Sequence, residues 1–139
     1  TKCTYTMSLT LASAFYILES KVPVQRYEKW LANLLPHVTA FKLVVFCDAQ
    51  SRTILDKYAN HNVVLVELPF EDFVTFKFKD HWVSNQKCLP PVLYGNANIE
   101  WKLNMLWSEK VFFVNRVIEN EYFPETQWYG WCECDGCES

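Results

Sequence analysis

The sequence predicts an α/β domain in which helices cover a mostly parallel sheet, and three observations support this fold class. Short apolar runs rich in β-branched and aromatic residues recur along the first half of the chain. Segments of about ten residues with the apolar spacing of a helix separate these runs. Half of the 139 residues are hydrophobic, which is enough for the core of one domain. Strands and helices that alternate on this scale are typical of βαβ units, whose strands pair in parallel.

The first half of the chain predicts three strands separated by two helices. The run that ends at Asp48 is continuously apolar, as in a strand buried on both faces. Pro36 ends the first helical pattern, and Ser51 is expected to cap the second helix. In chain order, the predicted segments are strand 9–18, helix 26–35, strand 42–49, helix 51–60 and strand 63–68.

The middle of the chain, residues 69–98, is expected to be irregular. Aromatic and charged residues alternate in its first half, which favours an edge strand or an aromatic-rich loop over a site. Pro90, Pro91 and Gly95 argue against a long helix before residue 98.

Residues 100–120 predict the clearest helix, which Asn120 and Pro124 are expected to end. At about 100° per residue, its apolar side chains fall on one broad arc. That arc contains Leu103, Leu106, Trp107, Val111, Phe113, Val114, Val117 and Ile118. The opposite face contains Asn104, Ser108, Glu109, Asn115, Arg116 and Glu119, and it is interrupted by Met105 and Phe112.

Lys110 lies near the centre of the apolar arc, close to Trp107. In one interpretation, its stem packs along the edge of the core and its ammonium group reaches water. In the other, its charge meets an anion such as a phosphate or a carboxylate, because a covered cation needs a partner. Lys110 and Trp107 are therefore candidates for binding an anionic ligand.

A fourth strand is predicted over residues 126–133, and acids follow it directly. An open parallel sheet binds ligands beyond the carboxyl ends of its strands. Asp48 follows the second predicted strand, while Glu133 and Asp135 come at or just after the end of the fourth. These three acids are therefore expected to face one crevice, with Lys110 close to it.

The acids at the end of the chain predict a metal site, with an alternative in the neighbouring cysteines. Glu133 and Asp135 are carboxylates of the kind that hold Mg²⁺ or Mn²⁺ and leave positions for phosphates. Three closely spaced thiols favour zinc instead, but a second Cys-x-x-Cys pair is missing. A third interpretation is that these cysteines bind nothing. The zinc alternative uses Cys132, Cys134 and Cys137 with a fourth ligand from Cys3, Cys88, His61 or His81.

Composition limits the classes of partner and the compartment. The formal charge of −3 argues against a nucleic-acid-binding protein, and no apolar run approaches the length of a membrane span. Two of the six cysteines lie inside apolar runs, which favours reduced thiols and a cytoplasmic protein over a disulfide framework. Residues 1–139 are interpreted as one domain. Since the chain begins at Thr1 rather than at methionine, a fragment of a longer protein is the alternative.

Several segments resemble one family of proteins. The stretch "WKLNMLWSEKVFFVNRVIENEYFPETQWYGWCE", together with "LVVFCD", "YEKWLANLL" and "LPFEDF", is similar to the HtrL/YibB-like family. This resemblance implies a Rossmann-like, three-layer domain of the kind that binds the nucleotide-sugar in GT-A-type glycosyltransferases. The donor it implies is a UDP-sugar, and the reaction is transfer of the sugar to a hydroxyl acceptor that the sequence does not identify.

The resemblance also implies roles for individual residues. Asp48 would lie near the nucleoside, Lys110 near the diphosphate, and Glu133, with Asp135, near Mn²⁺ or Mg²⁺. Glu133 stands where the family has aspartate, and the residues after it depart from the family pattern, so which acid holds the metal stays open. Two alternatives remain: a non-catalytic binding or interaction module, and a small zinc-stabilised domain.

Overall fold

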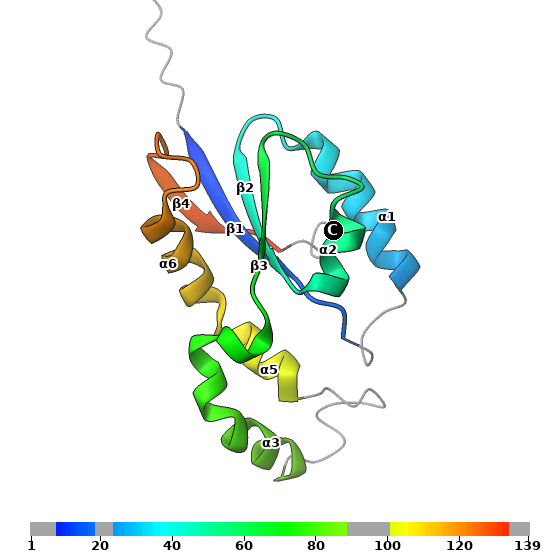
Figure 1. The fold of residues 1–139 in the computed structure, drawn as a ribbon, viewed down its shortest axis with the longest axis vertical. Helices are drawn as coiled ribbons and strands as arrows, with labels where there is room; N and C mark the ends of the chain where they lie inside the picture. Colours follow the sequence, from blue (N-terminus) through cyan, green and yellow to red (C-terminus); the bar gives the residue numbers. More distant parts are fainter. Residues whose placement is uncertain (1–7, 19–23, 89–100, 134–139) are drawn as a thin grey trace, which may run out of the picture.

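The computed structural model describes residues 8–18, 24–88 and 101–133. Its helices and strands alternate over the first half of this part, and helices then precede the last strand (Figure 1). The elements are β1 (Leu9–Phe15), α1 (Val24–Leu34), η1 (Leu35–His37), β2 (Lys42–Cys47), α2 (Ala49–Leu55), β3 (Val63–Glu67), η2 (Phe70–Asp72), η3 (Val74–Phe78), α3 (Lys79–Cys88), α5 (Trp101–Ser108), α6 (Lys110–Asn120) and β4 (Trp128–Trp131).

The four strands form one sheet in the order β3-β2-β1-β4, and every neighbouring pair is parallel. In this register Phe15 at the end of β1 pairs with Cys47 at the end of β2, whereas Trp131 at the end of β4 pairs with Ala12. The topology is Rossmann-like, and it confirms the predicted parallel α/β fold.

Helices pack on both faces of the sheet. Successive side chains of a strand point to opposite sides, and in β2 both sets are apolar. On one face, β2 contributes Leu43, Val45 and Cys47 to a core with α1 and α2. On the other face, its Val44 and Phe46 pack with α6. These five residues are all fully buried, as expected for a strand covered on both faces. Figure 1 shows α1 and α2 on one side of the strands and α6 on the other.

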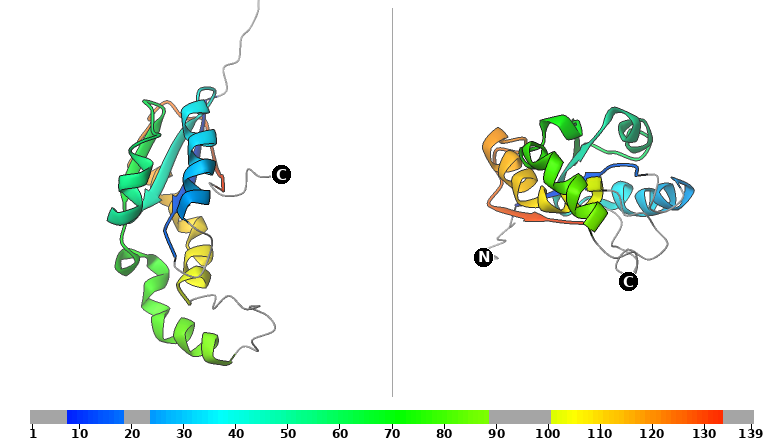
Figure 2. Two further views of the ribbon diagram at one scale, coloured as in Figure 1. Left: turned by 90° about the vertical axis from the view of Figure 1, so that its right-hand side faces the viewer. Right: turned by 90° about the horizontal axis from the view of Figure 1, so that it is seen from below.

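The predicted irregular middle is wrong for its first half, which forms 3₁₀ turns followed by helix α3. Phe70, Phe73 and Phe76 lie three residues apart, which is the period of a 3₁₀ helix and not the alternation of a strand. Phe73 is buried, and the other two rings pack against the same core. Helix α3 ends at Cys88, before the prolines that argue against helix. Both α3 and α5 lie beyond the carboxyl ends of the strands (Figures 1 and 2).

The predicted helix 100–120 is divided at Glu109 into α5 and α6, and it ends at Asn120 as expected. Its buried stripe follows i, i+4 spacing through Met105, Glu109, Phe113 and Val117. The predicted arc is therefore correct for Leu103, Phe113 and Val117, which are buried. It is wrong for Trp107, Val111 and Ile118, which are exposed, and for Met105 and Glu109, which are buried. The buried stripe is rotated towards Glu109 because this carboxylate is buried and accepts hydrogen bonds from Val74, Thr75 and Arg116.

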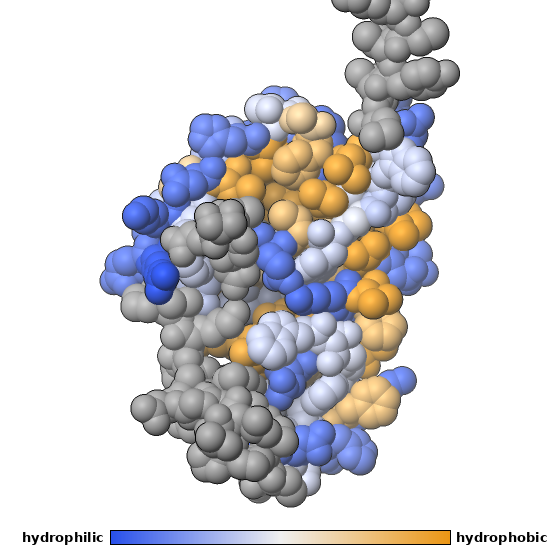
Figure 3. Space-filling view, turned by 180° about the vertical axis from the view of Figure 1, so that it is seen from behind, coloured by the Kyte–Doolittle hydropathy of each residue, from blue (hydrophilic) through white to orange (hydrophobic). Residues whose placement is uncertain are grey.

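Strand β4 is at one edge of the sheet and has β1 as its neighbour. Its first residue, Trp128, is 59% exposed. Hydrophobic side chains also reach the surface on the face of the molecule opposite to that of Figure 1 (Figure 3). In the described part of the chain, no helix is both long and apolar enough to span a membrane.

Candidate functional site

The order of the strands places a topological switch between β1 and β4. The chain proceeds from β1 through β2 to β3 on one side, and β4 then pairs with β1 on the other side. In open parallel sheets, ligands bind beyond the carboxyl ends of the strands at such a switch. Residues that follow β1 and β4, and the start of α6, are therefore the first candidates for a site.

Lys110 and Glu133 form an ion pair beyond the carboxyl end of β4, next to this switch. Lys110 is the first residue of α6, and its Nζ donates a hydrogen bond to Oε1 of Glu133, two residues after β4. The two side chains are 34% and 43% exposed, so the ion pair lies at the surface. This contact corrects the prediction that Lys110 lies at the centre of a buried arc. Its ammonium group lies over the Trp131 ring, and its charge reaches an anion of the protein itself.

Trp131 holds both members of the pair, and sequence analysis missed it as a site residue. Its indole Nε1 donates a hydrogen bond of 2.9 Å to Oε1 of Glu133. The Lys110 ammonium lies 5.5 Å from the centre of its ring, within the range of a cation–π contact. Its ring also stacks on Phe113 at 5.8 Å. The available signal was its position as the last residue of a strand, directly before Cys132 and Glu133.

Asp48 lies at the same end of the sheet but has a structural role in α2. It is the N-cap of this helix, and its Oδ1 accepts a hydrogen bond of 2.8 Å from the Ser51 backbone N–H. The predicted cap, Ser51, is instead buried, and its hydroxyl accepts from the Ile17 N–H at 3.1 Å. Strand β1 separates β2 from β4, and no hydrogen bond or ion pair between described residues joins Asp48 to Glu133. Asp48 and Glu133 thus lie at the same carboxyl end of the sheet, as predicted, but they do not contact each other directly.

Trp107 lies on α5, outside the ion pair of Lys110 and Glu133. It is 47% exposed on α5, and no ring contact or hydrogen bond within the described residues links it to Lys110 or Glu133. Helix α5 lies beyond the carboxyl ends of the strands, on the side where a ligand would approach (Figure 1). A role for Trp107 in ligand binding stays a prediction.

The described residues do not fit a metal site at this edge. Among residues 8–18, 24–88 and 101–133, no group of three or more His, Cys, Asp or Glu side chains could hold an ion. Oε1 of Glu133 already accepts hydrogen bonds from Lys110 and Trp131, which are donors and not ligands. Asp135 lies outside the described residues.

The zinc alternative also lacks a complete ligand set within the described part. His61 and His81 are both exposed, and Cys132 is partly exposed. No described cluster of three potential ligands includes any of them. The remaining candidates, Cys3, Cys134 and Cys137, fall outside the described residues, and of Cys88 only the backbone is described.

A second charged group, Glu109, is fully buried, although sequence analysis expected it on the polar face. Its carboxylate accepts hydrogen bonds from the backbone N–H groups of Val74 and Thr75, at 2.9 and 3.0 Å. It also accepts from the Thr75 hydroxyl and from the Arg116 guanidinium, both at 2.8 Å. These donors satisfy a buried anion and join the 3₁₀ turns to α6. Glu109 therefore has a structural role beside the site.

Two buried acidic groups near the ends of β1 and β2 stay protonated at neutral pH. Burial raises the pKa of the Cys47 thiol to about 12. Burial also raises the pKa of the Tyr16 phenol above its ordinary value, and this hydroxyl donates a hydrogen bond of 2.7 Å to the Leu68 carbonyl. Neither group therefore supplies an anion for a ligand or a metal at neutral pH.

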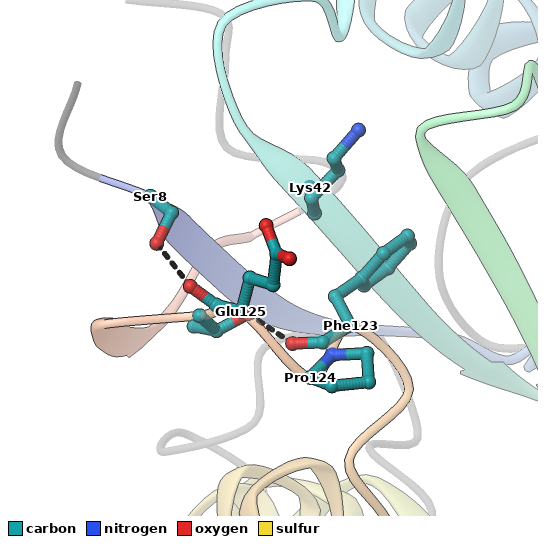
Figure 4. A pocket seen from close by; sticks show the side chains of 6 residues that line it. Ser8, Lys42, Phe123, Pro124 and Glu125 are labelled. Atoms are coloured by element: carbon teal, nitrogen blue, oxygen red, sulfur yellow. Dashed lines mark hydrogen bonds between the residues drawn. The ribbon is translucent and has the colours of Figure 1, made fainter.

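Two pockets lie away from the Lys110–Glu133 pair. One, of about 340 Å³, is between η3, α3 and α5, and is lined by Thr75, Phe78, His81, Trp82, Asn85 and Ser108. The other, of about 250 Å³, is near the amino ends of β1 and β2 (Figure 4). In this second pocket, the Ser8 hydroxyl donates to the Glu125 carbonyl at 2.6 Å, and Lys42 donates to Asn62. These contacts within the protein engage polar groups of the second pocket, and we assign no ligand to either pocket.

Comparison with known proteins identifies no relative of this chain. No family model, no curated protein and no solved structure matches it. The assignment of a function therefore depends on the fold and on the geometry at the switch point.

Proposed function

We propose that this chain binds a nucleotide-sugar beyond the carboxyl ends of β1 and β4, as the donor-binding part of a glycosyltransferase. The observation that carries this proposal is the position of a lysine, a tryptophan and a carboxylate at the topological switch of a Rossmann-like parallel sheet. The resemblance to the HtrL/YibB-like family favours a UDP-sugar as donor.

Each side chain has a chemical role in this proposal. The Lys110 ammonium is a point charge with three donors, which suits the oxygens of a diphosphate. Asp48, at the end of β2, would accept hydrogen bonds from the base or the ribose with the carboxylate oxygen that does not cap α2. Neutralising the charge of the diphosphate would assist its departure when the sugar is transferred to a hydroxyl acceptor.

A metal is not assigned to this proposed site. The Mn²⁺ or Mg²⁺ that the family resemblance implies would need ligands beyond those in the described part, where Glu133 is already bonded to two donors. In this proposal Lys110 and Asp48 are therefore the residues that contact the donor.

Replacing Lys110 by methionine is expected to weaken the binding of UDP about tenfold or more, because a hydrogen bond to a charged group contributes about 1.5–3 kcal/mol. Titration calorimetry with UDP measures this change. Lys57→Met is the matched control, since Lys57 is 60% exposed and pairs with Glu28, outside the site. Equal affinity of the Lys110→Met variant and the wild type would show that UDP binds elsewhere, and the absence of UDP binding to the wild type would refute the proposal.

A second candidate function, that of a non-catalytic interaction module, is supported by the edge strand β4. This strand has the sequence WYGW, without charge or proline, and edge strands of this kind pair readily with other strands. Trp128 is 59% exposed, and Val111 and Ile118 are exposed on α6, which packs next to β4. An antiparallel pair about a twofold axis would match this edge with itself, so its occupant in this proposal is β4 of a second copy.

Light scattering over a series of concentrations is expected to detect a dimer of the wild-type chain whose population rises with concentration. Trp128→Lys is expected to yield a monomer, because an edge lysine opposes strand pairing. Val74→Lys, at a site that is 39% exposed and outside β4, is the control. A monomeric wild type, or a dimer that survives in Trp128→Lys, would rule out this edge as the interface.

A further inference from the structure

We propose that Glu133 is the internal counter-ion of Lys110, and that a ligand diphosphate binds by displacing this carboxylate from the lysine. This inference rests on the proposed nucleotide-sugar function and specifies how the same site accepts its ligand. It differs from the role that the family resemblance implies for Glu133, in which the carboxylate would hold a divalent cation between itself and the diphosphate.

The bonds of Glu133 support a counter-ion and not a metal ligand. Its Oε1 accepts from both the Lys110 ammonium and the Trp131 indole, so the lone pairs of this oxygen face donors. No further potential metal ligand of the described part joins it in a group of three. A diphosphate that came close to Glu133 without a cation between them would be repelled. The Glu133 carboxylate and the diphosphate would therefore compete for the Lys110 ammonium.

Lys110 is the cation of α6 that a ligand can recruit. The helix contains one other basic residue, Arg116, which is bonded to the buried Glu109 and to the Asp72 carbonyl. Lys110, in contrast, bonds a carboxylate that is itself 43% exposed. Such surface pairs are weak because water and salt screen them, so a dianionic ligand can compete with a single carboxylate.

Trp131 lowers the free-energy cost of separating Glu133 from Lys110. Its indole N–H keeps one hydrogen bond to the carboxylate after the ammonium turns towards a ligand, and water can reach the exposed carboxylate group. The indole ring stays fixed by its stacking on Phe113. The lysine can therefore move while the groups around it stay in place.

If the ligand displaces Glu133 from Lys110, removing the charge of Glu133 should raise the affinity for the ligand. Glu133→Gln removes the competing charge but keeps an oxygen that accepts from Trp131. We expect this variant to bind UDP and inorganic diphosphate about two- to fivefold more tightly than the wild type in the presence of EDTA, the change that corresponds to an exposed ion pair of about 0.4–1 kcal/mol. Titration calorimetry with each ligand, in EDTA and again in Mg²⁺, measures the change.

Three further variants test whether the gain acts through Lys110, and a fourth assigns the NMR signal. Lys110→Met is expected to bind more weakly, and the double variant Lys110→Met/Glu133→Gln is expected to bind like Lys110→Met, because the gain acts through the lysine. Glu119→Gln removes an exposed charge elsewhere on α6 and is expected to leave the affinity unchanged. The NMR signal of the Trp131 indole N–H, assigned with Trp131→Phe, should shift on UDP binding in the same direction as it shifts in unliganded Lys110→Met.

The outcomes separate this inference from the proposed function. Weaker binding by Glu133→Gln, above all in Mg²⁺, would overturn it and indicate a metal ligand. An unchanged affinity, or a gain that persists without Lys110, would overturn it as well. Diphosphate binding with the expected order of affinities, but no binding of UDP, would refute the nucleotide function and keep the counter-ion. No binding of either ligand to any of these proteins would refute both.

Discussion

Replacing Glu109 by alanine is expected to lower the free energy of unfolding by about 3–5 kcal/mol, the usual cost of breaking a buried ion pair by removing one partner. The carboxylate is fully buried and accepts from two backbone N–H groups, one hydroxyl and Arg116. Without it, the N–H groups of Val74 and Thr75 lose their acceptor inside the core. Urea unfolding followed by circular dichroism measures the change.

Two related variants separate the contribution of charge from that of shape. Glu109→Gln keeps the size of the side chain but brings an amide N–H₂ group towards donors, and is expected to cost about 1.5–3 kcal/mol. Glu119→Ala, at an exposed position of the same helix, is expected to change stability by no more than about 0.5 kcal/mol. A cost below about 1 kcal/mol for Glu109→Ala would contradict the role assigned to this buried carboxylate.

Replacing Phe113 by alanine is expected to lower the free energy of unfolding by about 3–5 kcal/mol, because it opens a cavity among aromatic rings. Phe113 is fully buried and stacks on Phe46 at 4.9 Å and on Trp131 at 5.8 Å. Its loss would also leave the Trp131 ring without its support. Chemical unfolding measures the stability, and the indole N–H signal of Trp131 reports whether the site is disturbed.

Phe113→Leu and Val111→Ala are the controls for this prediction. Leucine refills much of the volume, so the first is expected to cost less than about 1.5 kcal/mol. Val111 is 74% exposed on the same helix, and its truncation should change stability by no more than about 0.5 kcal/mol. If Phe113→Ala cost no more than Val111→Ala, the packing of α6 against the sheet would need revision.

The prediction of β2 was correct because the burial of this strand depends on the residues of the strand itself. A run of apolar residues in "KLVVFC" allows both faces of the strand to be buried, and every residue from Leu43 to Cys47 is buried. The same holds for the fold class, since strands that alternate with helices form parallel sheets in few ways. The middle segment, expected to be irregular, instead forms 3₁₀ turns and helix α3, because the alternation of aromatic and charged residues hides phenylalanines spaced three residues apart.

The predicted buried face of helix 100–120 was wrong where a residue distant in sequence determines the position of a side chain. Glu109 has the character of a surface acid in sequence, and it becomes a core residue because Thr75, 34 positions earlier, donates to it. This contact rotates the buried stripe and leaves Val111 and Ile118 exposed. Helical periodicity contains no information about such a partner.

The sequence by itself determined the class of the sheet, and it identified Lys110 and Glu133 as charged residues near one end of it. Tertiary structure alone decided that these two residues bind each other across 23 positions, that Trp131 holds both, and that Asp48 caps α2. The reason is physical: the burial pattern of a strand depends on neighbours along the chain, whereas the partner of a charge depends on which surfaces the fold brings together.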